Sequence, residues 1–406
     1  MAALLLFDYA FGTLVLNKNK SIMPMKKRLL PLLVTLIFLT ACQKDEGKRV
    51  LLIGIDGLQY EQMHAIPTPN LDQLNFTKAY AGGITGTGTE QPTSSGPGWA
   101  TLLTGVWANK HQVWSNDLYI ADYRYPSFMF RTKKAVPSLS LSAVMNWIVP
   151  YFVFFIQEVP TLSYLSLGGD GSVTSQVARR IVDGRSDVTF VHLDAPDHAG
   201  HAHGFSPEHT QAVVDSDRLV GELLTAVAQR QAGNPTEDWL VMVVTDHGRE
   251  PVSGFGHGSQ TLEEKTVFIG VNKPDMNVAF SYQGEDLLYD DFDGLYGYPS
   301  QADVAPTIFR HLGISIQPQW KLEGVPLMGD LGVIRLMAVK DSDRDEVLLQ
   351  WINGTEFGGD IKIIRNGLLV ATLAGDETQY RDSSPNDLVL DYVVSANGVD
   401  TQIRVE

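Results

Sequence analysis

The chain has 406 residues, of which 44% are hydrophobic and 19% are charged, and this balance excludes a disordered or low-complexity protein. The length is enough for one large domain and a smaller one. The formal net charge is −16, so the chain lacks the basic surplus that binds nucleic-acid phosphates, and we predict no stable nucleic-acid complex. An anionic substrate would need local positive charge, which bound metal ions can supply.

The first part of the chain has the pattern of a bacterial lipoprotein signal. Basic residues at 26–28 precede the apolar stretch 29–39, and small residues precede Cys42, the one cysteine of the sequence. A single cysteine cannot close an intramolecular disulfide, and the apolar stretch is short for a bilayer span. We therefore predict a signal region with its lipobox over residues 1–42 and a lipidated Cys42. An uncleaved anchor and a buried cysteine are the alternatives.

Lipidation of Cys42 would anchor the protein to a membrane of the bacterial cell envelope. Gln43, which follows it, is not the aspartate associated with retention at the inner membrane. We therefore expect the outer membrane, on its periplasmic side. The oligomeric state is left open by the sequence.

Apolar runs typical of buried strands recur through the middle of the chain. They cover residues 49–56, 187–193 and 239–245, and a helical pattern over 210–230 lies between two of them. Strands that alternate with helices predict an α/β domain with a mostly parallel sheet flanked by helices, which we place over residues 43–332. In such sheets ligands bind at the carboxyl ends of the strands, where this sequence places acidic residues.

The pattern changes at about residue 333 to short runs of alternating polarity. They predict a small all-β sandwich over residues 333–406, and Asn366-Gly367 within it is a strong signal for a hairpin turn. Trp351 and Tyr392 make the pattern resemble a fibronectin type III domain, although either residue would fill the core of almost any sandwich.

The segment 119–169 is rich in aromatic and apolar residues. Its most apolar stretch, residues 143–156, is interrupted by Pro150 and is shorter than a membrane span. We expect this stretch to form a buried helix, with a lid over a substrate or a membrane contact as the alternative.

Two motifs place a carboxylate and a hydroxyl near strand ends. Asp56-Gly57 ends the first apolar run, and the glycine lets the backbone and a metal approach closely. Ser95 precedes Gly-Pro-Gly and a helix-forming stretch, which puts its hydroxyl at a helix N-terminus, where free backbone N–H groups favour an anion. This arrangement predicts a nucleophile in a phosphate cradle. A simple turn at Asp56 and an N-cap serine are the structural alternatives.

Two further motifs combine carboxylates with imidazoles. Residues 194–204 hold two aspartates and three histidines directly after the second apolar run. Asp246-His247 follows the third run, and His257 lies between two glycines. Carboxylates with imidazoles suit zinc or a similar divalent ion, whereas unrelated surface histidines are the alternative.

In their order and chemistry the four motifs resemble the alkaline phosphatase superfamily, most closely its nucleotide pyrophosphatase/phosphodiesterase branch. The resemblance extends over about residues 49–315. It implies that Asn116, together with the backbone N–H of Gly96, stabilises the developing negative charge on the substrate. It also implies two metal sites, one formed by Asp56, Ser95, Asp246 and His247 and the other by Asp197, His201 and His257.

The sequence departs from this branch at the nucleophile. The branch commonly has threonine in a Thr-Phe-Pro-Asn setting, whereas Ser95 is followed by Gly-Pro-Gly. The assignment of Ser95 therefore depends on its spacing to Thr104-Gly105, and Thr93 and Ser94 stay open. Trp99 stands where sulfatases, a sister group, have an arginine, which counts against a sulfatase.

The remaining histidines fall into two groups. His198 and His203 lie close enough to the motifs to assist a ligand or contact a substrate. No role is assigned to the others, which are His64, His111, His192, His209 and His311.

The resemblance implies a phosphoester hydrolase with two divalent ions, most readily Zn²⁺, in which Ser95 attacks phosphorus and forms a phosphoseryl intermediate. No arginine can be assigned near the motifs, and Trp99 with the segment 119–169 could form an apolar wall beside the metals. We therefore predict a phosphodiesterase or nucleotide pyrophosphatase acting on a small phosphoester such as a nucleotide. An alkaline phosphomonoesterase, a phospholipid-headgroup transferase and a non-catalytic binding lipoprotein stay open.

Overall fold

The protein was analysed as a computed structural model. Cys42 and the predicted signal region lie outside the described residues, so lipidation stays a prediction. Within the described part, no helix combines the length and the apolar character that crossing a membrane requires. The described residues are 47–117, 121–281, 292–341, 343–354, 359–383, 385 and 389–405.

A seven-stranded sheet forms the centre of the fold, in the order β2-β7-β6-β1-β5-β3-β4. From β6 to β4 neighbouring strands run parallel, whereas β7 runs antiparallel to both β6 and β2. The prediction of a mostly parallel α/β sheet is confirmed. The strands are β1 (Lys48–Ile55), β2 (Asn75–Tyr80), β3 (Leu141–Met145), β4 (Tyr164–Leu167), β5 (Val188–Leu193), β6 (Asp238–Val244) and β7 (Thr266–Val271).

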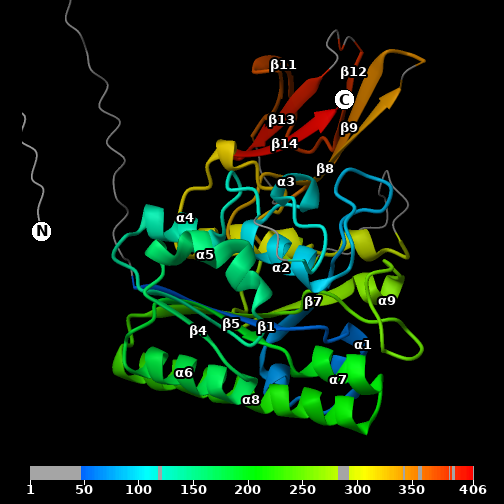
Figure 1. The fold of residues 1–406 in the computed structure, drawn as a ribbon. Coiled ribbons are helices and arrows are strands. Elements are labelled where there is room, and N and C mark those ends of the chain that lie inside the picture. The colour runs from blue at the N-terminus through cyan, green and yellow to red at the C-terminus, as the bar shows by residue number, and fades with distance from the viewer. Residues whose placement is uncertain are drawn as a thin grey trace, which may run out of the picture. The chain divides into compact units, whose positions relative to one another are not determined.

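Helices cover both faces of this sheet, as Figure 1 shows. Leu51 and Ile53 of β1 belong to the hydrophobic cluster formed with α6 (Asp170–Val182) and α8 (Pro207–Gly233). Leu52, which points to the opposite face, belongs to the cluster with α2 (Ser95–Thr104), α4 (Phe128–Ala135) and α11 (Val304–His311). The sheet is therefore buried on both sides, which explains its continuous apolar runs.

Short helices connect these layers. The α-helices among them are α1 (Tyr60–Ala65), α3 (Ala108–His111), α5 (Ile156–Glu158), α7 (Ala195–His203), α9 (Leu262–Lys265) and α10 (Val278–Ser281). Single turns of 3₁₀ or π type are η1 (Leu71–Gln73), η2 (Tyr151–Phe155), η3 (Val159–Thr161), η4 (Leu295–Gly297), η5 (Gln301–Asp303) and η6 (Pro318–Trp320).

The expected buried helix over residues 143–156 is wrong for its first half and right for its second. The first residues complete β3, which lies between β4 and β5 and is buried along its whole length. From Val149 the chain is helical, with the π-helical turn η2 followed by the short α5, and Val153 and Phe155 are buried. A short apolar run fits a buried strand as well as a buried helix, so the pattern alone could not separate the two.

The C-terminal part forms two small antiparallel sheets, in the orders β11-β10-β13-β14 and β12-β9-β8, as predicted. Trp351 and Tyr392 are buried in the core that the two sheets share. At the predicted hairpin, Asn366 and Gly367 connect β10 to β11 with φ of 48° and 81°, the positive values that a type I′ turn requires. The strands are β8 (Val333–Asp341), β9 (Glu346–Asn353), β10 (Ile361–Arg365), β11 (Leu368–Leu373), β12 (Gln379–Asp382), β13 (Leu390–Ala396) and β14 (Val399–Val405). The division into domains at residue 333 stays a prediction.

Candidate metal centre

The candidate ligands follow three neighbouring parallel strands. Asp56 comes directly after β1, Asp246 and His247 follow β6, and Asp197 and His201 lie on α7, which follows β5. Because β6, β1 and β5 are adjacent, their carboxyl ends meet at one edge of the sheet. Residues far apart in the sequence are thereby brought together.

The first cluster contains Asp56, Asp246 and His247, whose ligand atoms lie within 4.8 Å of one another. The Nε2 atom of His247 lies 3.5 Å from Oδ1 of Asp56 and 3.4 Å from Oδ2 of Asp246. Ser95, the first residue of α2, places its Oγ 3.0 Å from His247 Nε2 and 3.4 Å from Asp56 Oδ1. All four side chains are buried.

The second cluster contains Asp197, His201 and His257. Oδ2 of Asp197 lies 3.3 Å from Nε2 of His201, one helical turn along α7, and Oδ1 lies 3.9 Å from Nε2 of His257. The two clusters adjoin, because the rings of His247 and His257 stack with their centroids 3.8 Å apart. The His201 side chain is 49% exposed, so the second cluster is open to solvent.

The hydrogen bonds at these histidines leave the ring nitrogens that a cation needs. Nδ1 of His247 lies 2.8 Å from the carbonyl oxygen of Gly248, and Nδ1 of His257 lies 3.1 Å from that of Thr93. A carbonyl only accepts, so in both residues Nδ1 carries the hydrogen and Nε2 presents a lone pair. In the second cluster, Nε2 of His257 faces Nε2 of His201 at 3.0 Å, which is a natural arrangement for two ligands of one ion.

The surroundings of Asp246 indicate that the first cluster also suits a cation. Its Oδ2 is buried and has no hydrogen-bond partner among the described residues. Burial, and then the charge of Asp56, raise the pKa of Asp246 well above its ordinary value. Burial also lowers the pKa of His247 and His257, which keeps both imidazoles neutral at neutral pH. A divalent cation would satisfy these groups, so the residues present fit such ions.

Asp56 is held by two donors that the sequence did not reveal. Its Oδ2 accepts hydrogen bonds from Nε1 of Trp99, at 2.9 Å, and from Nε2 of His192, at 3.0 Å. Trp99 is thus buried behind the site, and the expectation that it forms an apolar wall for the substrate is wrong. His192, to which no role was assigned, lies within the apolar sequence of β5. In the sequence it therefore looks like a residue of the core. Since its Nε2 donates to Asp56, it has no lone pair there for the group that it forms with Asp194.

Asn116 lies at the N-terminus of α2, but the backbone N–H of Gly96, expected to assist it, is already paired. Oδ1 of Asn116 accepts a hydrogen bond of 2.7 Å from the backbone N–H of Gly96, so that N–H is not free for a substrate. Pro97 has no N–H, and the N–H of Gly98 bonds to the carbonyl of Ser94. The N–H of Gly96 therefore orients Asn116, whose side-chain amide nitrogen can still donate.

The other two candidate hydroxyls have different surroundings. Thr93 donates to Oε2 of Glu264 at 2.8 Å, and Ser94 is the N-cap residue of α2. His198 and His203 are exposed and belong to neither cluster. Among the three hydroxyls considered, the structure brings that of Ser95 to the first cluster.

An arginine that the sequence analysis did not assign lies at the second cluster. Arg249 is fully buried two residues after His247, and its Nη1 donates to Oδ1 of Asp197. Its proximity to a metal-ligand motif in the sequence was the one signal that could have revealed it.

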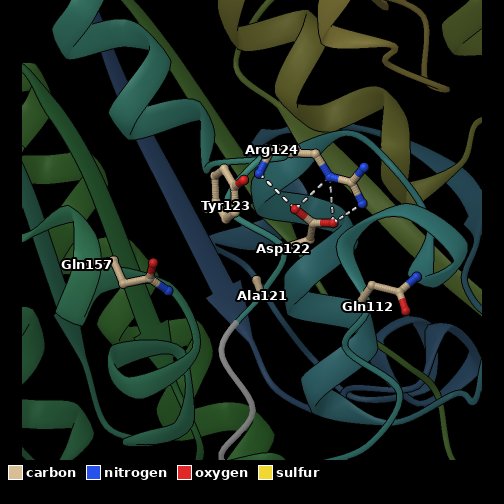
Figure 2. A pocket seen from close by; sticks show the side chains of 6 residues that line it. All are labelled: Gln112, Ala121, Asp122, Tyr123, Arg124 and Gln157. Atoms are coloured by element: carbon tan, nitrogen blue, oxygen red, sulfur yellow. Dashed lines mark hydrogen bonds and ion pairs between the residues drawn. The ribbon is translucent and has the colours of Figure 1, made fainter.

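A pocket of about 470 Å³ lies away from these residues. In Figure 2 the charged groups of Asp122 and Arg124 point toward each other, and Arg124 Nε donates to both carboxylate oxygens at 2.9 and 3.0 Å. The pocket's two charges are therefore paired. None of the seven predicted ligands lines it; its walls are Gln112, Ala121, Asp122, Tyr123, Arg124 and Gln157.

Comparison with known proteins identifies the family. The family model described as type I phosphodiesterase / nucleotide pyrophosphatase matches residues 50–163 and 168–291, more than half of the chain. The chain belongs to this family. The resemblance read from the motifs is thereby confirmed at the level of the family, whereas no curated protein sequence matches the chain.

Solved structures show similar folds at low sequence identity. Murine ectonucleotide pyrophosphatase/phosphodiesterase 5, in an inactive form with AMP, is 17% identical over 50% of this chain and 57% of its own length, with a TM-score of 0.38. Ps i-CgsB in complex with k-i-k-neocarrahexaose is 16% identical over 76% of this chain and 82% of its own, with a TM-score of 0.50. An alkaline phosphatase superfamily protein from Vibrio parahaemolyticus is 13% identical over 90% and 83%, with a TM-score of 0.46.

Asp246 is expected to destabilise this family member when no metal is bound. Its raised pKa means that the folded state holds the proton more tightly than the unfolded state, so stability falls as pH rises above about 4. Asp246→Asn removes the buried charge and keeps an oxygen for the N–H of Gly57, which now donates to Oδ1 at 3.1 Å. In EDTA we expect it to raise the free energy of unfolding by about 1–3 kcal/mol at pH 8, and less at pH 5.

Chemical denaturation at both pH values measures this effect. Asp217→Asn is the matched control, because this buried carboxylate accepts from the N–H groups of Asn70 and Leu71 and should lose stability when changed. An Asp246→Asn protein less stable than the parent at pH 8 in EDTA would contradict the interpretation.

Trp99→Phe tests the orientation of Asp56. The change keeps an aromatic ring but removes the indole N–H that donates to Oδ2 of Asp56. We expect affinity for a divalent cation at the first cluster to fall about 10-fold, because donors behind a ligand tune its geometry. Isothermal titration with Zn²⁺ measures the affinity. Trp239→Phe is the control, since this indole is equally buried but donates to Glu237 instead; equal losses in both variants would refute the role of Trp99.

Proposed function

We propose that the protein is a metal-dependent phosphoester hydrolase that uses two divalent cations and Ser95 as its nucleophile. The observation that carries the proposal is the position of Ser95 Oγ, which lies 3.0 Å from His247 Nε2 and 3.4 Å from Asp56 Oδ1, beside a second cluster of ligands. Membership of the phosphodiesterase/pyrophosphatase family supports this chemistry.

In this proposal each cluster holds one cation. Asp56, Asp246, His247 and the Ser95 hydroxyl would hold the first, and Asp197, His201 and His257 the second. The bound cations would supply positive charge that lowers the pKa of the attacking hydroxyl and offsets the charge on the phosphoryl oxygens. Nitrogen and oxygen donors of this kind favour Zn²⁺.

Ser95 would carry the substrate through two displacements. Its Oγ loses its proton and forms a bond to phosphorus as the bond to the leaving oxygen breaks, and the leaving oxygen takes up a proton. This releases an alcohol, or a phosphate where a pyrophosphate bond is split, and leaves the other ester arm on the phosphoryl group of Ser95. Water then attacks the same phosphorus, the bond to Oγ breaks, and a phosphomonoester is released as Ser95 regains its proton. Asn116, whose Oδ1 is fixed by the N–H of Gly96, would direct its amide N–H groups to a phosphoryl oxygen. The half-exposed side chain of His201 leaves a route for water to the second cluster.

A diester is the substrate class that the surroundings of Ser95 favour. A monoester carries a second ionised oxygen that needs a further positive group. Arg249 is buried behind Asp197 and bonded to it, so its charge is directed away from a substrate. Oδ2 of Asp56 is likewise held by the N–H groups of Trp99 and His192 rather than left for a third cation. We therefore propose a phosphodiesterase or nucleotide pyrophosphatase acting on small diesters such as nucleotides.

The cellular setting is part of the proposal. A lipidated Cys42 at the end of the signal region would place the catalytic domain at the outer membrane, on its periplasmic side. The C-terminal sheets would then form a separate sandwich domain from residue 333 onward.

Metal analysis and three substrates test the proposed function. We expect about two metals per purified chain and turnover of bis-p-nitrophenyl phosphate and p-nitrophenyl thymidine monophosphate above that of p-nitrophenyl phosphate. Ser95→Ala should lower kcat on the order of 10³-fold, because no residue replaces the nucleophile. Ser94→Ala, which removes the neighbouring hydroxyl, is the matched control and should retain activity.

The outcomes separate the alternatives. A preference for p-nitrophenyl phosphate would indicate a phosphomonoesterase. Bound metal without turnover of any substrate would point to a headgroup transferase or a binding protein. A chain that binds no divalent metal would refute the proposal.

A further inference from the structure

Arg249 occupies a position that core packing alone does not explain. Its side chain is fully buried, and the guanidinium donates hydrogen bonds to three separate partners. Nη1 donates to Oδ1 of Asp197, Nε donates to the carbonyl of Gly254, and Nη2 donates to the carbonyl of Phe255 at 3.0 Å. A planar guanidinium carries its donors on three nitrogens in fixed directions, whereas the three donors of a lysine ammonium share one nitrogen.

Two glycines make the space that the guanidinium fills. A Cβ at Gly200 of α7 would lie 2.4 Å from both Cζ and Nε of Arg249. A Cβ at Gly57, after β1, would lie 2.9 Å from Nη1 and 2.4 Å from Oδ1 of Asp197. Two segments far apart in the sequence thus leave room for one side chain, which indicates a slot shaped for arginine.

The carbonyls of Gly254 and Phe255, which accept from Arg249, belong to the chain segment between the two clusters. This segment begins after His247, a candidate ligand of the first cluster, and ends at His257, a candidate ligand of the second. The backbone N–H of Glu250 donates to the carbonyl of Gly256 at 2.9 Å, which closes the segment on itself. Arg249 directly precedes this closure and connects the segment to Asp197 on α7.

The contact with Asp197 also distinguishes its two oxygens, since only Oδ1, 3.9 Å from His257 Nε2, accepts from Arg249. Because Oδ1 accepts from Arg249, Oδ2 is the oxygen directed to His201, at 3.3 Å. The same guanidinium therefore orients the carboxylate ligand and holds the segment that carries the imidazole ligand His257.

We infer that Arg249 is the positioning residue of the second cation site, which fixes Asp197 and His257 relative to each other and to the first cluster. The inference rests on the proposed function, because it needs two cation sites. It goes further in assigning the assembly of the second site to one buried side chain that contacts neither the cations nor the substrate.

Arg249→Lys separates charge from geometry. Lysine keeps the positive charge near Asp197 but cannot also serve the carbonyls of Gly254 and Phe255. We expect affinity for the second cation to fall about 10- to 100-fold while affinity for the first stays as in the parent. Arg131→Lys is the matched control, since Arg131 is a buried arginine of α4 whose guanidinium lies over the ring of Trp320 instead.

Gly200→Ala supplies an independent variant that keeps Arg249. Alanine favours the helix more than glycine does, so α7 should fold at least as well. Its Cβ would displace the guanidinium from its slot. The same selective loss at the second site is expected, without any change of charge.

Binding of Mn²⁺, followed by calorimetric titration and by the EPR signal of exchange-coupled ion pairs, gives the readout without any assay of activity. The parent and Arg131→Lys should bind two ions and show the coupled signal. Arg249→Lys and Gly200→Ala should bind one ion tightly and lose that signal at ion concentrations that saturate the parent.

A parent protein without two sites would refute the proposed function itself. Two sites in the parent, with unchanged affinity and coupling in both Arg249→Lys and Gly200→Ala, would overturn the role of Arg249 alone. Loss of both sites in a folded Gly200→Ala protein would also overturn it, because the proposed role concerns the second site only.

Discussion

The repulsion between buried carboxylates is the constraint on which the site depends. Asp56, Asp197 and Asp246 end up within one small region because β1, β5 and β6 are parallel neighbours, and water is excluded from Asp56 and Asp246 within it. Burial and the charge of Asp56 raise the pKa of Asp246, because the ionised carboxylate is unfavourable here without a counter-charge. Arg249 pairs with Asp197, but Asp56 and Asp246 are met by neutral donors. Divalent cations would supply the missing counter-charge in such a region.

The layers of the fold supply the rigidity that is needed to hold the three carboxylates close together. β1 is buried on both faces, so the position of Asp56 at its end is fixed by packing against both helical layers. Ser95 is presented by the first turn of α2, whose residues are buried along the whole helix. Ligands on such elements are placed more accurately than ligands on free loops, which suits a site whose atoms must stay within a few ångströms of one another.

The sequence allowed prediction of the candidate ligands that the structure brings together, but not of the groups that hydrogen-bond to them. Aspartate, histidine and serine after apolar runs carry their chemistry in their residue type, and the order of the runs predicted the parallel sheet. Trp99, His192 and Arg249 donate to candidate ligands and belong to no predicted motif, and in the sequence they look like core or surface residues. The turn at Asn366-Gly367 was predictable because its backbone angles favour those residues, whereas the apolar run 143–156 fitted strand and helix equally well.

The three aspartates share one arrangement, and it bears on the identity of the metal. In each carboxylate one oxygen accepts an N–H from the protein while the other is directed to its cluster, so each is prepared to bind through a single oxygen. The first cluster then offers four donor atoms and the second offers three, with solvent at the second. Few donors of mixed nitrogen and oxygen type suit the four-coordinate geometry of zinc, whereas calcium and magnesium prefer six or more oxygens. The N–H groups behind the ligands thus support the proposal of zinc more directly than the residue types alone; they come from Trp99 and His192 for Asp56, Gly57 for Asp246, and Arg249 for Asp197.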